Sequence, residues 1–260
     1  MPGAMTAEIP DQEDPLRKYV FGVAISDLSK EAALHFLQAQ IAQNRHVKLA
    51  FCNAHTANIA WGNPDLRHCL RDFTVFADGL GVDIAAKVLH GSPFAANLNG
   101  TDFVPELVHS FDKPLRIAMI GGRPAIAEIA ARRLAAFTPQ HSFAPLLHGF
   151  GDAAEIASFM QQLESSPVDV LLVAMGNPRQ ERWIAQHIDK RHATLAIGVG
   201  ALFDFMADAV PRAPAWLRDM RMEWLFRLAQ EPKRLFGRYV LGNPLFLLRV
   251  AIVKLGLRRF

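Results

Sequence analysis

The segment Phe76-Ala77-Asp78-Gly79-Leu80-Gly81 places the strongest constraint on how this chain folds. An apolar run that starts at Phe73 ends there, and an apolar run with helical periodicity begins at Val82. We therefore expect a buried strand that delivers one carboxylate to a glycine turn at a helix N-terminus. The free N–H groups of that helix would attract an anion, and the glycines leave room for it. Two roles stay open for Asp78, the N-cap of the helix or a functional carboxylate.

Strand-like and helix-like runs alternate along the rest of the chain. Strands are expected over residues 19–25, 47–51, 73–76, 115–120, 168–174 and 195–199, and helices over 31–42, 82–90, 103–111, 125–137, 153–163 and after Pro178. This alternation predicts an α/β fold with a largely parallel sheet and helices on both faces. The turns that follow the strands should gather along one edge of the sheet, where ligands bind.

Glycines and polar residues occupy these strand-end turns and the first turns of the helices that follow. The candidates for substrate binding are Asn53, Gly79, Gly81, Gly121, Gly122, Gly176, Gln180, Glu181, Gly200 and Asp204. The glycine pair before Pro124 suits a phosphate-facing loop, although it lacks the full dinucleotide spacing. The Gln180 amide can both donate and accept hydrogen bonds to a sugar.

Structural roles are open for several residues in these segments. Asn53 can form an Asx turn instead of binding a ligand. Thr101 or Asp102 can cap the helix that follows. Glu181 can be a favourable charge near a helix N-terminus.

Charge divides the chain into an acidic body and a basic tail. Of 28 Lys/Arg and 25 Asp/Glu residues in all, eleven basic and three acidic residues lie from Arg212 onward, so residues 212–260 carry +8 and residues 1–211 carry −5. Such asymmetry favours a polyanionic partner. We expect a flexible lead over residues 1–18, an α/β catalytic domain over 19–210 and a helical appendage over 211–260.

The expected appendage mixes basic and apolar residues. Arg218, Arg221 and Arg227 alternate with apolar residues at helical spacing, and residues 245–257 are almost wholly apolar. Such helices suit an interfacial position on an anionic membrane. The alternative is a helical pair that packs on the sheet with a solvated arginine face, and the apolar surface would also serve a homo-oligomer. No apolar run approaches the roughly 18 residues of a membrane span.

Cysteine content and the N-terminus limit the class of protein. Cys52 and Cys69 make neither a disulfide framework nor a metal-ligand set, and we expect both to be reduced core residues in a cytosolic protein. The acidic N-terminus has neither the basic nor the apolar region of a signal peptide.

Taken together, these segments resemble the WecG/TagA/CpsF glycosyltransferases (glycosyltransferase family 26). The matching motifs follow the family's order and cover most of the chain. They are Asn53, residues 76–81, 100–102, 120–124, 148–150, 176–181, 198–204, 212–214, 223–228 and 231–234.

The resemblance implies an inverting transfer of a sugar, such as a hexose, N-acetylhexosamine or uronic acid, from a UDP-sugar to a polyprenyl-diphosphate-linked acceptor. It also implies a Rossmann-like sheet, no required metal or other cofactor, and an appendage at the cytoplasmic face of the membrane. Bacterial surface polysaccharide biosynthesis is the expected setting.

The resemblance also implies roles for individual residues. Asp78 matches the proposed general base of the family, and Gln180 matches its substrate-contacting glutamine. The matched segments add Gly100, Thr101 and Asp102 to the expected substrate-binding residues. Arg212, Arg221 and Arg227, with Arg234 and Arg238, are the candidates to stabilise the leaving diphosphate, because a reaction without a metal needs positive charge there.

Two residues depart from the family pattern near the expected sugar pocket. Phe51 stands where members often carry threonine, and Asn97, a further candidate for substrate binding, stands where many carry arginine. Both bear on which sugar is used.

Two other classes of function compete with this interpretation. The sheet and glycine turns alone would suit a dinucleotide-dependent oxidoreductase, but the complete glycine fingerprint is missing. The basic tail alone would suit a non-catalytic module that binds nucleic acid or another polyanion. The apolar run over residues 245–257 argues against a nucleic-acid partner.

Overall fold

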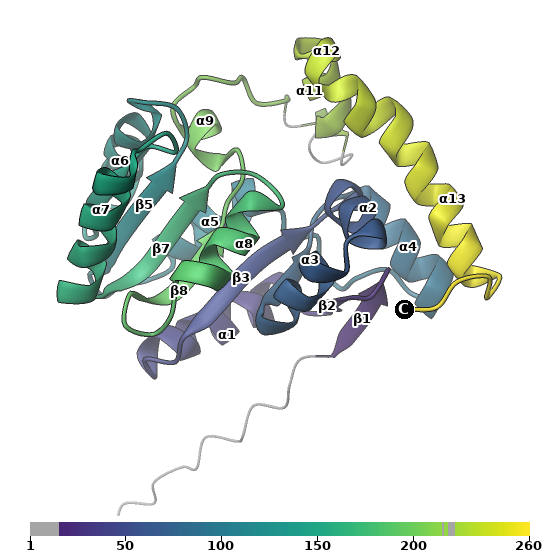
Figure 1. Ribbon diagram of the computed structural model, residues 1–260, viewed down its shortest axis with the longest axis horizontal. Coiled ribbons are helices and arrows are strands. Elements are labelled where there is room, and N and C mark those ends of the chain that lie inside the picture. Colours follow the sequence, from purple (N-terminus) through teal and green to yellow (C-terminus); the bar gives the residue numbers. More distant parts are fainter. Residues whose placement is uncertain (1–15, 215, 218–221) are drawn as a thin grey trace, which may run out of the picture.

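The computed structural model describes residues 16–214, 216, 217 and 222–260, which form one mixed sheet flanked by helices (Figure 1). Within this part of the chain the strand order is β1-β2-β4-β3-β8-β7-β5-β6. β1 and β2 pair antiparallel, and every other neighbouring pair is parallel. The strands are β1 (Arg17–Val20), β2 (Val23–Ser26), β3 (Val47–Cys52), β4 (Thr74–Ala77), β5 (Arg116–Gly121), β6 (Ser142–Leu147), β7 (Val168–Ala174) and β8 (Ala193–Gly198).

Helices cover both faces of the sheet, which confirms the predicted fold class. The helices of the sheet domain are α1 (Lys30–Ala42), α2 (Ala54–Gly62), α3 (Pro64–Cys69), α4 (Leu80–His90), α5 (Gly100–His109), α6 (Ile126–Phe137), α7 (Ala153–Ser165), α8 (Arg179–His187) and α9 (Leu202–Met206), with a short 3-10 turn η1 (Leu70–Asp72). One core layer joins the sheet to α2, α3, α4, α7 and α8, and the other joins it to α1, α5, α6 and α9. The position of β7 between the two core layers explains why its sequence is so apolar. Its side chains alternate between two buried layers, with Val173 in one and Leu172 in the other.

The first strand prediction was wrong in detail. Residues 19–25 do not form one strand, because the chain turns at Phe21 and Gly22 and returns as the antiparallel strand β2. The Phe21 ring is buried and lies 4.9 Å from the Trp61 ring and 5.2 Å from the Phe246 ring, centroid to centroid. The apolar residue in the middle of the run therefore anchors a turn.

β6, α2 and α3 were not expected from the sequence. β6 pairs only with β5, so it is an edge strand, where Pro145 is tolerated but weakens the strand pattern. The side chains of Asn53 and Asn63 cap α2 and α3. These two helices are short, and the polar residues that cap them lie so close together in the sequence that the segment resembles a loop.

α5 begins before the expected position. Its N-cap is Asn99, whose Oδ1 accepts a hydrogen bond from the Asp102 backbone N–H at 3.0 Å. Thr101 and Asp102 lie in the first turn, so the prediction that one of them caps the helix was wrong.

The chain beyond Met222 forms a helical arm. It consists of α11 (Glu223–Gln230), α12 (Pro232–Phe236), a π-helical turn η2 (Gly237–Leu241) and α13 (Gly242–Lys254). Residues Pro232–Lys254 are continuous, and the helix is long and apolar enough to cross a membrane by length and composition alone. The expectation that no such run exists was wrong. The helix continues through Pro244, which has no N–H to donate. The π-helical turn η2 lies directly before α13, in which Pro244 is the third residue.

One face of the arm packs on the sheet domain, and the other is exposed. α13 lies along α2 and α4 at the outside of the molecule (Figure 1), where Phe246 and Val250 are buried. The far end is fastened to Trp61, because the Arg258 guanidinium lies 4.2 Å from its ring centroid and the Phe260 ring 5.2 Å away. The division into a lead over 1–18, a domain over 19–210 and an appendage over 211–260 stays a prediction, and residues 1–15 of the lead lie outside the described chain.

Candidate active site

The register of two parallel strands brings Asp78 and Asn53 together. β3 and β4 pair with Cys52 opposite Ala77, and the next residue of each strand is Asn53 and Asp78. The Asp78 backbone N–H donates to the Cys52 carbonyl at 3.0 Å, and Asn53 Nδ2 donates to Asp78 Oδ2 at 3.1 Å. Both predicted residues thus lie side by side at the carboxyl edge of the sheet.

Asp78 does not cap α4, so one of its two predicted roles is excluded. Gly79 is the N-cap residue, with φ +90°, and no side chain caps the helix. The Gly79 N–H donates instead to Asn97 Oδ1 at 2.7 Å. Asn53 has the expected structural role as well as a contact to Asp78, because its Oδ1 accepts from the N–H groups of His55 and Thr56, both at 3.1 Å.

The environment of Asp78 favours the protonated carboxyl more than water does. Burial raises its pKa, while the hydrogen bond from Asn53 and the positive charges of Arg238 and Arg227 act in the opposite direction. The charge of Asp102 adds a smaller upward effect. A carboxylate with a raised pKa is a stronger base than an ordinary aspartate and is suited to accept a proton.

Two arginines of the arm reach this site. Both Arg227 Nε and Arg238 Nε are buried and have no hydrogen-bond partner among the described residues. Burial lowers the pKa of Arg238. Burial, with a smaller effect of the nearby Arg238 charge, lowers the pKa of His55 to about 4. The Arg227 guanidinium also lies 5.2 Å from the centroid of the Phe205 ring. These donors can therefore receive an anionic ligand next to Asp78.

The other predicted arginines are placed differently. Arg212 Nη1 forms an ion pair with Asp102 Oδ1 at 2.8 Å, and its Nη2 lies 3.6 Å from Glu223 Oε2. Arg234 pairs with Glu231. Arg221 lies outside the described residues. Arg238 was one of five arginine candidates, and nothing in the spacing of the basic tail shows which of them folds back onto the sheet. His55 was not singled out as a site residue.

The predicted glycines fall into two groups. Gly79, Gly176 and Gly200 have open space where a Cβ would lie, although their N–H groups already donate to Asn97 or Gln180. The others are close to neighbouring atoms, and packing, together with a positive φ at Gly121 and Gly122, explains why each is glycine. A Cβ would approach Ala54 Cβ to 2.9 Å at Gly81, the Phe51 ring to 2.9 Å at Gly100, the Ala174 carbonyl oxygen to 2.2 Å at Gly121 and Ile126 to 3.1 Å at Gly122.

Gln180 and Glu181 are buried beneath the turns that follow β7 and β8. Gln180 Oε1 accepts from the N–H groups of Gly176 at 3.1 Å and Gly200 at 3.0 Å. Gln180 Nε2 donates to Glu181 Oε1 at 2.9 Å. With 2% and 0% of their surfaces exposed, these side chains do not face solvent. Glu181 is more than a favourable charge at a helix start, because it holds the neighbouring amide.

The remaining predicted acidic residues are engaged in ion pairs. Asp102 Oδ2 accepts from Asn99 Nδ2 at 2.9 Å, and Asp102 also pairs with Arg212. Asp204 Oδ1 lies 3.9 Å from the exposed Arg123. Thr101 lies in the first turn of α5 beside Asp102.

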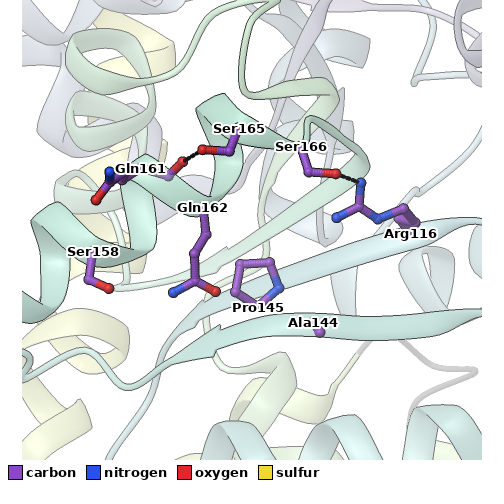
Figure 2. Close-up of a pocket in the computed structure, with 8 residues that line it drawn as sticks. All are labelled: Arg116, Ala144, Pro145, Ser158, Gln161, Gln162, Ser165 and Ser166. Atoms are coloured by element: carbon purple, nitrogen blue, oxygen red, sulfur yellow. Dashed lines mark hydrogen bonds between the residues drawn. The ribbon is translucent and has the colours of Figure 1, made fainter.

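Neither of two hollows of about 400 Å³ lies at Asp78. One is lined by Ala144 and Pro145 of β6, by polar residues at and just after α7, and by Arg116 (Figure 2). Arg116 begins β5, so this hollow lies at the opposite end of that strand from the site. The other lies between the β1–β2 turn, the end of α4 and the end of α13. Among the described residues, His, Cys, Asp and Glu side chains do not form a group of three that could hold a metal ion.

Comparison with known proteins identifies the family. The model of the glycosyl transferase WecG/TagA/CpsF family matches residues 18–260. The chain belongs to this family. Similar proteins are named N-acetylglucosaminyldiphosphoundecaprenol N-acetyl-beta-D-mannosaminyltransferase in Staphylococcus aureus strains MW2, NCTC 8325 and MRSA252. Each is 27% identical over 234 residues, covering 85% of this chain and 89% of the relative.

Family membership makes the protein a glycosyltransferase, and the oxidoreductase and polyanion-binding alternatives are set aside.

The structure places the two residues that depart from the family pattern, Asn97 and Phe51. Asn97 is part of the site, because it holds the N–H of Gly79. Phe51 is buried under Gly100 with its ring near those of Phe76 and Phe103, so it supports α5 from below.

We expect Asp78→Asn to raise Tm at pH 7. The pKa of Asp78 in the folded protein lies above the unfolded value of about 3.9. The wild type therefore loses folding stability as the pH rises from the unfolded pKa to the folded pKa. Above that window the loss is constant. Asparagine removes this loss, so the gain in Tm should shrink toward zero as the pH is lowered through the window. Thermal melts of both proteins between pH 4 and 8 measure it.

Asp152→Asn is the matched control, since Asp152 caps α7 in an exposed capping box. Asparagine is an equally good N-cap, so we expect little change in Tm. A Tm for Asp78→Asn at or below that of the wild type at pH 7 would contradict the electrostatic account of the site.

Proposed function

We propose that this protein is an inverting glycosyltransferase that transfers a sugar from a UDP-sugar to a polyprenyl-diphosphate-linked acceptor in bacterial surface polysaccharide biosynthesis. The observation that carries the proposal is the contact of Asp78 with Asn53, next to the open backbone of Gly79 and the free donors of Arg227 and Arg238. The names of the Staphylococcus aureus relatives support the same class of acceptor. Hexoses, N-acetylhexosamines and uronic acids are the candidate sugars.

In the proposed reaction, Asp78 is the general base. The acceptor hydroxyl oxygen attacks the anomeric carbon from the side opposite the UDP, the bond from that carbon to the UDP oxygen breaks, and Asp78 takes the hydroxyl proton. This geometry inverts the anomeric configuration. Asn53 keeps the carboxylate oriented, because its own position is fixed as the cap of α2.

The leaving diphosphate requires positive charge as the bond breaks. Arg227 and Arg238 lie close enough to Asp78 to act on its charge, and their buried Nε donors have no partner in the described chain. Fixed donors in an enclosed site stabilise developing charge strongly because they need no reorganisation. We assign the diphosphate to these two arginines. Arg212 is not included, because it is held in an ion pair with Asp102. Gly79, Gly176 and Gly200 would leave room for the diphosphate, because no atom lies where a Cβ of theirs would be.

We expect wild-type protein to form a glycolipid from one of a panel of radiolabelled UDP-sugars and a short polyprenyl-diphosphate-sugar acceptor. Asp78→Asn should lower the rate by about 10²–10⁴-fold, because asparagine keeps the shape of the side chain but cannot accept the proton. EDTA should leave the wild-type rate unchanged, since the proposal needs no metal. An active Asp78→Asn variant would remove Asp78 as the base.

Arg227→Gln and Arg238→Gln should each weaken binding of UDP by about ten- to a hundredfold, the loss typical of a charge-assisted hydrogen bond. Isothermal titration with UDP measures this. Arg234→Gln is the matched control on the same arm, because Arg234 is exposed and paired with Glu231. Equal losses in all three variants would point to a general effect of charge and contradict the assignment.

We also propose that the arm docks on the cytoplasmic face of an anionic membrane. Leu241, Leu245, Leu248 and Leu255 are exposed, and their spacing places them on one side of the helix, opposite the buried Phe246 and Val250. Lys233 and Lys254 lie at the two ends of this helix. An apolar face with basic residues beside it suits the headgroup region, and the alternative occupant is a second copy of the chain.

Leu241→Gln with Leu248→Gln should reduce cosedimentation with phosphatidylglycerol vesicles about tenfold or more, because two large apolar side chains no longer enter the interface. Phe150→Gln is the control, since Phe150 is equally exposed but lies before α7. These substitutions leave the buried contacts of Phe246 intact, which a deletion of residues 212–260 would not. Unchanged vesicle binding, with loss of a dimer in solution, would favour self-association instead.

A further inference from the structure

A buried pair of side chains connects two turns of the candidate site. Gln180 is the first link, because one amide oxygen accepts hydrogen bonds from the backbone of both Gly176 and Gly200. Gly176 follows β7 and Gly200 follows β8, and these strands are neighbours in the sheet. A single side chain thus sets the spacing between two strand-end turns.

The chemistry of the neighbours fixes the orientation of the Gln180 amide. Its oxygen faces two backbone N–H donors, and its nitrogen faces the Glu181 carboxylate. Reversing the amide would place donor against donor and acceptor against acceptor. Gly198 supplies the space, because a Cβ there would lie 2.8 Å from Gln180 Nε2.

Glu181 is the second link, and its burial requires an explanation. One carboxylate oxygen, Oε1, accepts from Gln180 Nε2 at 2.9 Å and from Asn177 Nδ2 at 2.6 Å. The other, Oε2, is buried and has no hydrogen-bond partner among the described residues. Burying a carboxyl with one oxygen unpartnered costs free energy. We therefore look for a role that a smaller or apolar side chain could not fill. Here Glu181 holds two amides from the same turn and helix start.

The two turns offer an open backbone on their outer side. A Cβ at Gly176 or Gly200 would meet nothing within 4 Å, whereas Gly198 below them is filled by Gln180. The turns are therefore fixed from inside by side-chain hydrogen bonds and left free on the side where a Cβ would lie.

We propose that Glu181 is a positioning residue that, by holding Gln180, fixes the spacing of the Gly176 and Gly200 turns so that their outer faces receive the nucleotide-sugar. This rests on the proposed function for the identity of the ligand. Gln180 then acts as an internal brace, and its amide reaches the substrate only through the two glycine turns.

The test compares Glu181→Gln with Glu181→Met. Glutamine keeps an oxygen for Gln180 and Asn177, whereas methionine fills the space without an acceptor. We expect Glu181→Met to raise Kd for UDP and KM for the UDP-sugar about tenfold or more, with a smaller change in kcat, and Glu181→Gln to restore binding to within about threefold of the wild type. Equal losses in the two variants would overturn the inference.

A second readout needs no ligand. Loss of the brace should speed hydrogen exchange of the Gly176 and Gly200 amides about tenfold or more in Glu181→Met, but not in Glu181→Gln. His141→Leu is the matched control. His141 is a buried side chain that also joins two backbone segments, through Leu115 N–H and the Val108 carbonyl, at the opposite end of β5. The His141→Leu substitution should lower Tm without changing the affinity for UDP or the hydrogen exchange of the Gly176 and Gly200 amides.

The outcomes separate this inference from the proposed function. Unchanged exchange in Glu181→Met would overturn the brace, and faster exchange with unchanged UDP affinity would overturn its link to the ligand. A wild type that binds no UDP would overturn the proposed function and that link together, while the exchange comparison still decides whether Glu181 holds the turns.

Discussion

The parallel pairing of β3 with β4 is the constraint on which the candidate site depends. With Cys52 opposite Ala77, the first residues beyond the two strands are an amide and a carboxylate that form a hydrogen bond. Side chains alternate along a strand, so a shift of one residue would turn Asp78 away from Asn53. The same asparagine caps α2, and the N–H that follows Asp78 is held by Asn97, so each neighbour of the carboxylate is itself fixed.

Enclosed charge then gives the site its chemical character. Asp78 and Glu181 both have pKa values raised by burial, but their surroundings differ. Asp78 faces Arg227 and Arg238 from the arm, so it can exchange a proton in a region that also attracts an anion. Glu181 is surrounded by the amides of Gln180 and Asn177, so it serves the structure around it. Two carboxyls near one sheet edge are thus suited to different tasks because of their neighbours.

Much of the fold followed from the sequence, while details that depend on long-range contacts did not. Alternating apolar runs and glycine turns gave the parallel sheet with helices on both faces. The hairpin at Phe21 was missed because its apolar side chain packs on Trp61 and Phe246, which are distant in sequence. The continuous helix through Pro244 was missed because a proline usually ends a helix, and only packing on α2 and α4 shows that it continues.

The sequence by itself determined the fold class, the family and the edge of the sheet where Asn53, Asp78 and the glycine turns gather, since local periodicity and motif order are encoded in neighbouring residues. Only the tertiary structure decided which of these groups are packed against other atoms and which have open space or unpartnered donors beside them. It separated the open glycines from Gly81, Gly100, Gly121 and Gly122, which are glycines because other atoms lie against them. It also selected Arg227 and Arg238 from the basic tail. The physical reason is that burial and the direction of a side chain depend on residues far apart in the chain, which no local pattern records.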